Sequence, residues 1–562
     1  MLQKSEEKKM KYIRSFLLIL VLFTLVLGAC GESGQNASSS KEIEEQEEKV
    51  VHLSAPGEIP SLDPTLADND FSFNVINQVF EGLYRLDKDG EPQLAMAASE
   101  PEVSDDGRVY TFTLRDDATW SDGSPVTAHD FEYSWKKAVD PETSAAYGPQ
   151  FEEIVEGASE ILVGDKPSDE LGVKALDDET LEVTLEAPIP YFKDLLTTAV
   201  FFPQPKEYVE EQGKDYALDS DHALYNGPFI LTDWNGTGDT WSYVKNDHYW
   251  DKEAVNVDRI QVSVVKDTQT AVDLYENDQL DRVVLSGDFV DEYQSDDEYH
   301  TYLTGGVRFL KMNQGKDDEE TELANLNIRK ALNMALDRDA IVDHLLNNGS
   351  TALYATVAEG LAENPETDED FRNENGDLTY YDEDEARDNW EEGLKELGIN
   401  ELELELTTSD SSSTKVIAEN LKNQWESVLP GLTIIIKNVP PKQSVEANVT
   451  QNFDLILTGW GGDYQDPMTY LNLFITDSPG NHTGFSNERY DELVLKSKSS
   501  LAGKPKERWD SLLEAERILI EDNAVLIPIS QNGTAYLEKE RIKNFITYKV
   551  SADNYKWIDV EE

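Results

Sequence analysis

The chain contains very little cysteine and few basic residues, and each shortage argues against particular kinds of site or partner. Cys30 is the only cysteine among 562 residues, so an internal disulfide, a cysteine-based zinc site and a thiol redox pair are excluded. Only 48 Lys and Arg stand against 113 Asp and Glu, which gives a formal net charge of −65. This charge argues against nucleic acid and anionic membrane surfaces as partners, because binding to phosphate requires basic side chains.

The sequence also lacks the short motifs of common catalytic sites. It has no Gly-x-Ser-x-Gly, no His-Glu-x-x-His and no glycine-rich Lys-Ser/Thr phosphate loop. No two of its seven histidines lie within five positions of each other, so no sequential metal site is expected. Residues 87–90 resemble part of a calcium loop, but Arg85 stands where the first carboxylate should be, and we predict a hairpin turn. These absences favour a binding protein over an enzyme and predict neither a metal nor a cofactor.

The composition nevertheless predicts a folded body. Hydrophobic residues make up 39% and aromatic residues 9% of the chain, which is too much for a disordered acidic protein. At roughly 100–200 residues per domain, the length fits several domains or one large multi-lobed body. The strongly acidic surface suits salty or alkaline surroundings.

The first residues have the pattern of a secretory signal. Basic residues precede an apolar run from Phe16 to Leu27, which is shorter than the ~20 residues that span a bilayer. The run ends in Gly28-Ala29-Cys30, which resembles a bacterial lipobox. The resemblance implies a signal peptide over residues 1–30, started at Met1 or Met10, with cleavage before Cys30 and a lipid on its sulfur. An ordinary signal peptide with an incidental cysteine is the alternative.

Residues 31–49 are polar and acidic with almost no apolar side chains, which indicates a flexible tether. We therefore expect a protein on the extracellular side of a cell membrane, held by its lipid alone. This placement favours a Gram-positive, salt- or alkali-adapted bacterium. The folded body should begin near Val50.

Several local patterns predict secondary structure in the body. Alternating residues around Asp106-Gly107 predict a hairpin between 103 and 120. Thr127 is a good N-cap for a helix that ends before Pro141. Trp120 and Trp135 are expected in the core.

The stretch from 401 to 466 predicts a parallel sheet. Strands are expected over 402–406, 432–436 and 453–458, with helices between them over 416–428 and 442–449. Strands that alternate with helices at this spacing form a parallel sheet with right-handed crossovers. Ligands bind such sheets at the carboxyl ends of the strands.

A glycine-rich segment, 459–467, directly follows the third of these strands. Its glycines allow close approach of a ligand, Trp460 offers an apolar wall, and Asp463 supplies a negative charge. This combination predicts a site for a ligand that is cationic and partly apolar. A tight turn with a packed tryptophan explains the same residues and remains the alternative.

Several motifs together resemble one family. They are Phe80-Glu81-Gly82-Leu83-Tyr84-Arg85, residues 110–115, residues 120–135, Asn226-Gly227-Pro228-Phe229, and Gly459-Trp460 with Asp463-Tyr464. In this order they resemble the oligopeptide-binding lipoproteins that serve peptide-importing ABC transporters, extracellular solute-binding proteins of family 5.

The resemblance implies an α/β, two-lobe, periplasmic-binding-protein-like fold with a hinge and an extra third domain. Lobe I would combine residues 50–80, 225–310 and 527–562. The third domain would extend lobe I over residues 81–224, and lobe II would cover residues 311–526.

The resemblance also implies the ligand and the residues that bind it. A short peptide with a free N-terminus would lie extended between the lobes, bound through its backbone. Asp463 would bind its α-ammonium group and Trp460 would flank a side chain, with Gly459 and Tyr464 in the same motif. The protein would work as a monomer, without a cofactor, and would deliver peptides to an ABC permease.

The sequence departs from the family pattern at the peptide's carboxyl end. Leu457 stands where some relatives have an arginine that binds the carboxylate, and a histidine with the same task aligns near 411–413, which are serines. A tyrosine-rich strand of some relatives is replaced by Arg308-Phe309-Leu310. Arg308 or a nearby lysine is therefore the candidate partner of the carboxylate, and the preferred peptide length stays open.

Other functions remain as alternatives. The same fold binds nickel chelates, haem or oligosaccharides in other members, although Asp463 favours a free amine. A peptide-sensing accessory lipoprotein would bind peptides without importing them, and a surface hydrolase would turn them over.

Overall fold

The computed structural model describes residues 48–316 and 319–561, and the part from Glu48 onward forms one compact unit. The predicted signal peptide, Cys30 and residues 31–47 of the tether lie outside the described residues. Within the described ranges, no helix has both the length and the apolar composition needed to cross a bilayer.

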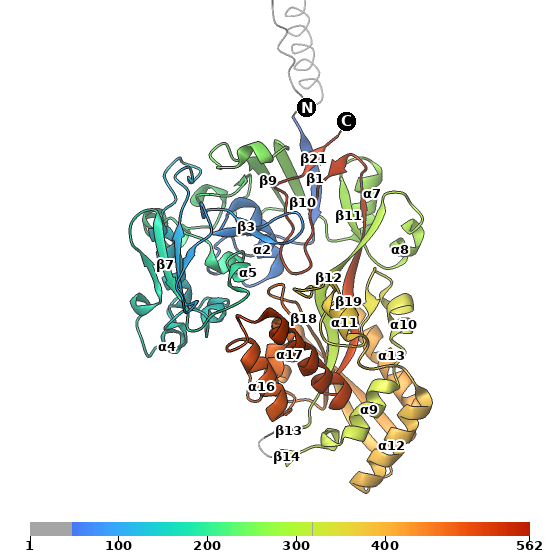
Figure 1. Cartoon of the computed structure of the whole chain (residues 1–562). Helices are drawn as coiled ribbons and strands as arrows, with labels where there is room; N and C mark the ends of the chain where they lie inside the picture. Colours follow the sequence, from blue (N-terminus) through green and yellow to red (C-terminus); the bar gives the residue numbers. More distant parts are fainter. Residues whose placement is uncertain (1–47, 317–318, 562) are drawn as a thin grey trace, which may run out of the picture. The chain divides into compact units, whose positions relative to one another are not determined.

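The first sheet joins segments that lie far apart in the sequence (Figure 1). In spatial order its strands are β1 (Val50–Ala55), β10 (Arg259–Val264), β9 (Thr240–Lys245) and β8 (Phe229–Thr232). Alternate side chains of β1 are buried, as expected for a strand with one face on a core. Helix α2 (Asp70–Val79) has Asn69 as its N-cap and buries Val75, Ile76 and Val79. The strand predicted at Val50 is therefore present as β1.

A second four-stranded sheet lies within residues 81–224. Its order is β4 (Glu102–Val103), β5 (Val109–Thr113), β7 (Thr180–Thr184) and β6 (Val173–Ala175). The predicted hairpin is the antiparallel pair β4–β5. Helix α3 (Ala128–Val139) follows the predicted N-cap Thr127, whose N–H donates to Asp130 at 2.9 Å. Trp120 and Trp135 are 1% and 0% exposed, which confirms their place in the core.

The turn at residues 87–90 joins β2 (Tyr84–Leu86) to β3 (Pro92–Leu94), and the two strands pair antiparallel. The prediction of a hairpin turn there is confirmed.

The largest sheet contains the predicted parallel unit. Its strand order is β11 (Arg282–Leu285), β19 (Leu526–Glu538), β12 (Tyr299–Met312), β18 (Leu455–Trp460), β16 (Leu402–Ser409) and β17 (Leu432–Val439). β16 pairs parallel with both β17 and β18, and helices α13 (Ser412–Val428) and α14 (Pro441–Val449) form the crossovers. The prediction is confirmed, with each strand ending a few residues later than expected.

Helices cover both faces of this sheet (Figure 1). One face packs against α9 (Leu326–Met334), α12 (Glu383–Leu397) and α13, where Trp390 and Trp425 are completely buried. Helices α16 (Glu488–Ser497) and α17 (Pro505–Arg517) lie on the other side. The carboxyl end of β18 lies at a cavity that it shares with α2.

Strands β12 and β19 connect the two large parts of the body. Residues 299–303 of β12 pair with residues 533–537 of β19, and the pairing shifts register before it resumes at Val307. Both strands cross a predicted lobe boundary, since β12 continues to Met312 and β19 begins at Leu526. The domain bounds themselves stay a prediction.

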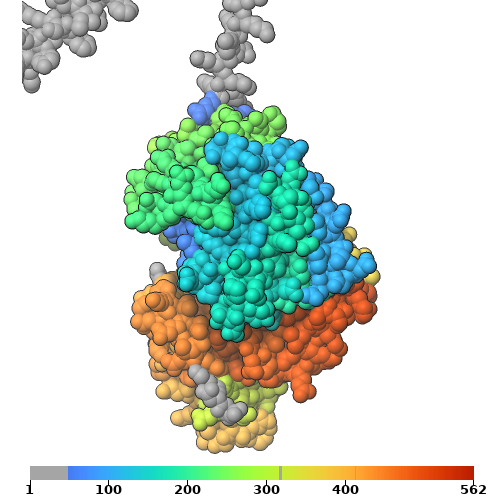
Figure 2. All heavy atoms as spheres, turned by 90° about the vertical axis from the view of Figure 1, so that its left-hand side faces the viewer, coloured from blue at the N-terminus to red at the C-terminus, as the bar shows by residue number. Residues whose placement is uncertain are grey.

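The region of residues 81–224 also contacts the late part of the chain. In Figure 2 its blue-to-teal surface lies against the orange-red surface of that part. The Nζ atom of Lys498 lies 2.7 Å from the Glu153 carboxylate.

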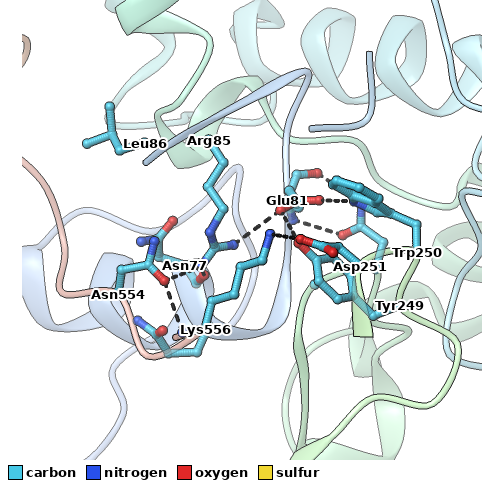
Figure 3. Close-up of polar contacts among 12 residues, drawn as sticks. Asn77, Glu81, Arg85, Leu86, Tyr249, Trp250, Asp251, Asn554 and Lys556 are labelled. Carbon is cyan, nitrogen blue, oxygen red and sulfur yellow. Dashed lines mark hydrogen bonds and ion pairs between the residues drawn. The ribbon is translucent and has the colours of Figure 1, made fainter. Parts of the chain in front are cut away.

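A buried polar cluster joins the end of α2 to two distant segments (Figure 3). The carboxylate of Glu81 accepts hydrogen bonds from the Tyr249 hydroxyl at 2.6 Å and the Trp250 indole N–H at 2.7 Å. Arg85 lies 3.5 Å from the same carboxylate and donates to the Asn554 side chain at 3.0 Å. Because buried charges are costly unless they are paired and hydrogen-bonded, this cluster fixes how these three segments meet.

Candidate functional site

A cavity of about 820 Å³ lies at the carboxyl end of β18. Its walls come from α2, from residues 457–463, and from a loop of residues 547–553 near the end of the chain. Four of the predicted site residues line it: Arg308, Gly459, Trp460 and Asp463. Tyr464 is not among its lining residues.

Asp463 presents an unpaired carboxylate to this cavity. Its backbone N–H donates to the Thr469 hydroxyl at 2.9 Å, which fixes the loop. Among the described residues, no side chain forms an ion pair or a hydrogen bond with the carboxylate. Burial, with a smaller contribution from the carboxylate of Asp70, raises the pKa of Asp463 to about 6. A half-buried anion without a partner is stabilised by a cationic ligand.

Trp460 forms an apolar wall of the same cavity. Its ring is half-buried against the larger hydrophobic core, and its indole N–H has no hydrogen-bond partner within the described ranges. This position suits contact with a ligand side chain.

The two glycines beside Trp460 have different surroundings. A Cβ atom at Gly459 would lie 2.5 Å from the Val307 carbonyl oxygen, because β18 pairs closely with β12 there. A Cβ atom at Gly461 would meet nothing within 4 Å. Close packing against β12 thus explains why a glycine stands at position 459. Contact between Gly459 and a ligand remains a prediction.

Tyr464 points to a neighbouring cavity of about 390 Å³. Its ring stacks on that of Tyr191, with centroids 4.4 Å apart and an interplanar angle of 3°. Asp463 lines both cavities, so the tyrosine pair supports the far side of the Asp463 loop. A direct contact between Tyr464 and a ligand stays a prediction.

Arg308 is a cation without a counter-ion at the same cavity. It lies on β12 opposite Gly459, and desolvation lowers its pKa. In the part of the chain that the structure describes, its guanidinium has no ion pair and no hydrogen-bond acceptor. Ser409, the last residue of β16, and Thr414, in the first turn of α13, line the cavity with it. A helix N-terminus and an unpaired arginine together favour an anionic group.

Several lining residues could not be found from the sequence. They include Asp70, Phe73 and Tyr147 near Asp463, and Lys549 and Asp553 in the 547–553 loop. None belongs to a motif that suggests binding, and each reaches the cavity only through the tertiary fold.

Comparison with known proteins gives consistent matches. Residues 91–482 match the family described as bacterial extracellular solute-binding proteins, family 5. The chain is 37% identical to a dipeptide-binding protein of Lactococcus lactis over 484 residues, which is 84% of this chain and 85% of that protein.

Two solved structures are also similar. One is the oligopeptide-binding protein OppA of Listeria monocytogenes bound to peptide, with a TM-score of 0.76, 43% identity, and coverage of 92% of this chain and 100% of that one. The other is the pheromone receptor PrgZ, whose structure describes peptide binding, with a TM-score of 0.76, 39% identity and the same coverage. These likenesses confirm the predicted α/β fold class with two lobes.

Proposed function

Because this chain belongs to the bacterial extracellular solute-binding proteins of family 5, we propose that it captures short peptides and delivers them to an ABC import permease. The observation that supports this most is the unpaired Asp463 carboxylate in a cavity of about 820 Å³. Similarity to proteins named for binding dipeptides and peptides agrees with it. We propose no catalytic step.

The peptide's amino end lies at Asp463 in this proposal. A charge-assisted hydrogen bond from the α-ammonium group to the carboxylate contributes about 1.5–3 kcal/mol. Trp460 contacts a peptide side chain. Gly459 and Tyr464 act by positioning the Asp463 loop, through the β12–β18 pairing and the stack on Tyr191.

The carboxyl end lies at Arg308, which replaces the arginine missing at Leu457. We expect Arg308→Met to weaken binding of a free tripeptide about tenfold, because the peptide carboxylate loses its cation. The same peptide with an amidated carboxyl end should bind both proteins alike. If the substitution weakened both peptides equally, the assignment of Arg308 to the carboxylate would be wrong.

The proposal includes a lipid anchor at Cys30 on the extracellular side of the membrane. A single acyl chain gives only marginal anchoring, so we expect more than one on the mature N-terminus. Cys30→Ser should release the protein from the membrane fraction into the medium.

Native mass spectrometry of the purified protein tests the function without a choice of ligand. We expect a ladder of bound masses that fragment as short peptides. A single bound mass that is not a peptide would contradict the proposal. If the protein purifies empty, thermal-shift titration with peptides of two to six residues replaces the experiment, and no shift with any of them would contradict it.

Similarity to a pheromone receptor favours peptide sensing as a second candidate. Uptake of a labelled peptide separates the two roles. Import predicts that deletion of this protein abolishes uptake, whereas sensing predicts unchanged uptake and a lost transcriptional response to the peptide.

A further inference from the structure

Two carboxylates that form no ion pair with any described residue, those of Asp70 and Asp463, line the same cavity. Asp70 lies in the first turn of α2, and Asp463 lies in the loop after β18, so the two come from different parts of the body. Both line the cavity, and Asp70 is close enough to Asp463 to raise its pKa. Among the described residues, neither forms an ion pair with a lysine, arginine or histidine.

Tyr147 lines the cavity together with the two carboxylates. The residue is half-buried, and burial, followed by the carboxylates of Asp463, Asp70 and Asp68, raises its pKa to about 12. Its ring packs edge-on against Phe73, with centroids 4.8 Å apart, and both rings line the cavity. Aromatic faces beside two carboxylates favour a cation with an apolar stem.

The other charged groups that line the cavity form no ion pair with Asp70 or Asp463, and this includes Arg308 on β12. Asp553 is a further acidic group of the cavity; burial raises its pKa, although Arg282, Thr547 and Asn74 favour its ionised form. Lys549 donates to the Glu359 carbonyl oxygen at 3.0 Å. Since one peptide α-ammonium neutralises one carboxylate, a second negative charge remains near the first residue of the ligand.

We propose that Asp70 makes the site selective for peptides whose first residue carries a basic side chain. The α-ammonium group pairs with Asp463, and the lysine or arginine side chain of the same residue passes Tyr147 and pairs with Asp70. This inference rests on the proposed peptide-binding function and adds the class of peptide.

The test must separate the effect of Asp70 on binding from the effect of the net charge of −65, which attracts every cation. Lys-Ala-Ala and Ala-Ala-Lys have the same net charge and differ only in where the lysine stands. Norleucine-Ala-Ala keeps a similar apolar stem without the charge. Preference for the first peptide over the other two therefore reports a local partner.

The variant Asp70→Asn has a close control in Glu488→Gln. Helices α2 and α16 both have 10 residues and an asparagine N-cap, and Asp70 and Glu488 are the exposed first residues after those caps. Glu488 does not line the cavity. Both substitutions remove one negative charge from the same helix position, and thermal melting checks that both proteins are folded.

Isothermal titration calorimetry in about 0.15 M salt then gives the result. We expect the unmodified protein and Glu488→Gln to bind Lys-Ala-Ala about fivefold more tightly than either other peptide, and Asp70→Asn to lose this preference. No preference in the unmodified protein, or an unchanged preference in Asp70→Asn, would overturn the inference and leave peptide binding intact. Failure to bind any of the three peptides would overturn the proposed function as well.

Discussion

Asp463 is the residue on which the proposed recognition depends. Its loop is held by the hydrogen bond to Thr469, and its carboxylate forms no ion pair with any described residue, although Arg308 lines the same cavity. The free protein therefore keeps a charge in a place where burial and Asp70 both disfavour it. An ammonium group of a ligand stabilises the ionised carboxylate. Relief of this unfavourable charge in the free protein therefore contributes to the binding free energy.

The pH dependence of binding follows from the same residue. The pKa of Asp463 is raised to about 6, so in the free protein the carboxyl gains a proton as the pH falls through that value. Only the ionised form pairs with an ammonium group, and affinity should therefore decrease below pH ~6, approaching tenfold per unit. Calorimetry between pH 5 and 7 checks this, with Asp463→Asn as the control that stays flat. A flat profile for the unmodified protein would contradict the role of Asp463.

At the scale of elements, the site depends on the pairing of β18 with β12. Residues 455–460 of β18 pair with residues 307–312 of β12, which places Arg308 directly opposite Gly459. One pair of strands thus positions both Arg308 and the start of the loop that carries Asp463. Gly459 permits this pairing because the Val307 carbonyl leaves no room for a side chain.

Alanine substitution of Gly459 in β18 and of Gly461 in the following loop compares a position that has no room for a Cβ atom with one that has room. Gly459→Ala should lower the melting temperature by several degrees, because its Cβ would lie 2.5 Å from a backbone oxygen. Gly461→Ala, two residues along the same loop, meets nothing within 4 Å and should melt like the unmodified protein. Equal melting temperatures for the two variants would show that the strands adjust at no cost.

The elements differ in how well the sequence predicts them. The unit over residues 402–460 was predictable because each strand and helix has its own periodicity and a clear stop such as Pro430-Gly431. Asp463 and Trp460 were found because they directly follow that unit. The long pairing of β12 with β19 was not predictable, since it joins residues from distant parts of the chain. For the same reason Asp70, Tyr147 and the 547–553 loop gave no signal.

At the scale of the whole molecule, the body combines a strongly acidic surface with contacts between its parts. Gln465 donates to the Gly90 carbonyl oxygen at 2.6 Å, and Lys498 lies 2.7 Å from Glu153. The Gln465 bond and the Tyr191–Tyr464 stack connect the region of residues 81–224 to the Asp463 loop, and the Lys498 ion pair connects that region to the end of α16. They hold a molecule whose net charge of −65 opposes compactness.

Salt should therefore stabilise the protein. The Debye length falls from about 10 Å at 0.1 M to about 3 Å at 1 M, which screens repulsion among surface carboxylates. We expect the melting temperature to rise by several degrees over this range of sodium chloride. A constant or falling melting temperature would show that specific ion pairs, which salt weakens, outweigh the net repulsion.

The central claim is that the Asp463 carboxylate binds the peptide's α-ammonium group, and a thermodynamic cycle tests it most directly. Calorimetry compares a tripeptide and its analogue without the amino group, each with the unmodified protein and with Asp463→Asn. We predict that either single change weakens binding more than tenfold and that both together weaken it no further, because they remove the same interaction. If loss of the amino group still weakened binding tenfold in Asp463→Asn, the ammonium group would be bound elsewhere and the account would be wrong.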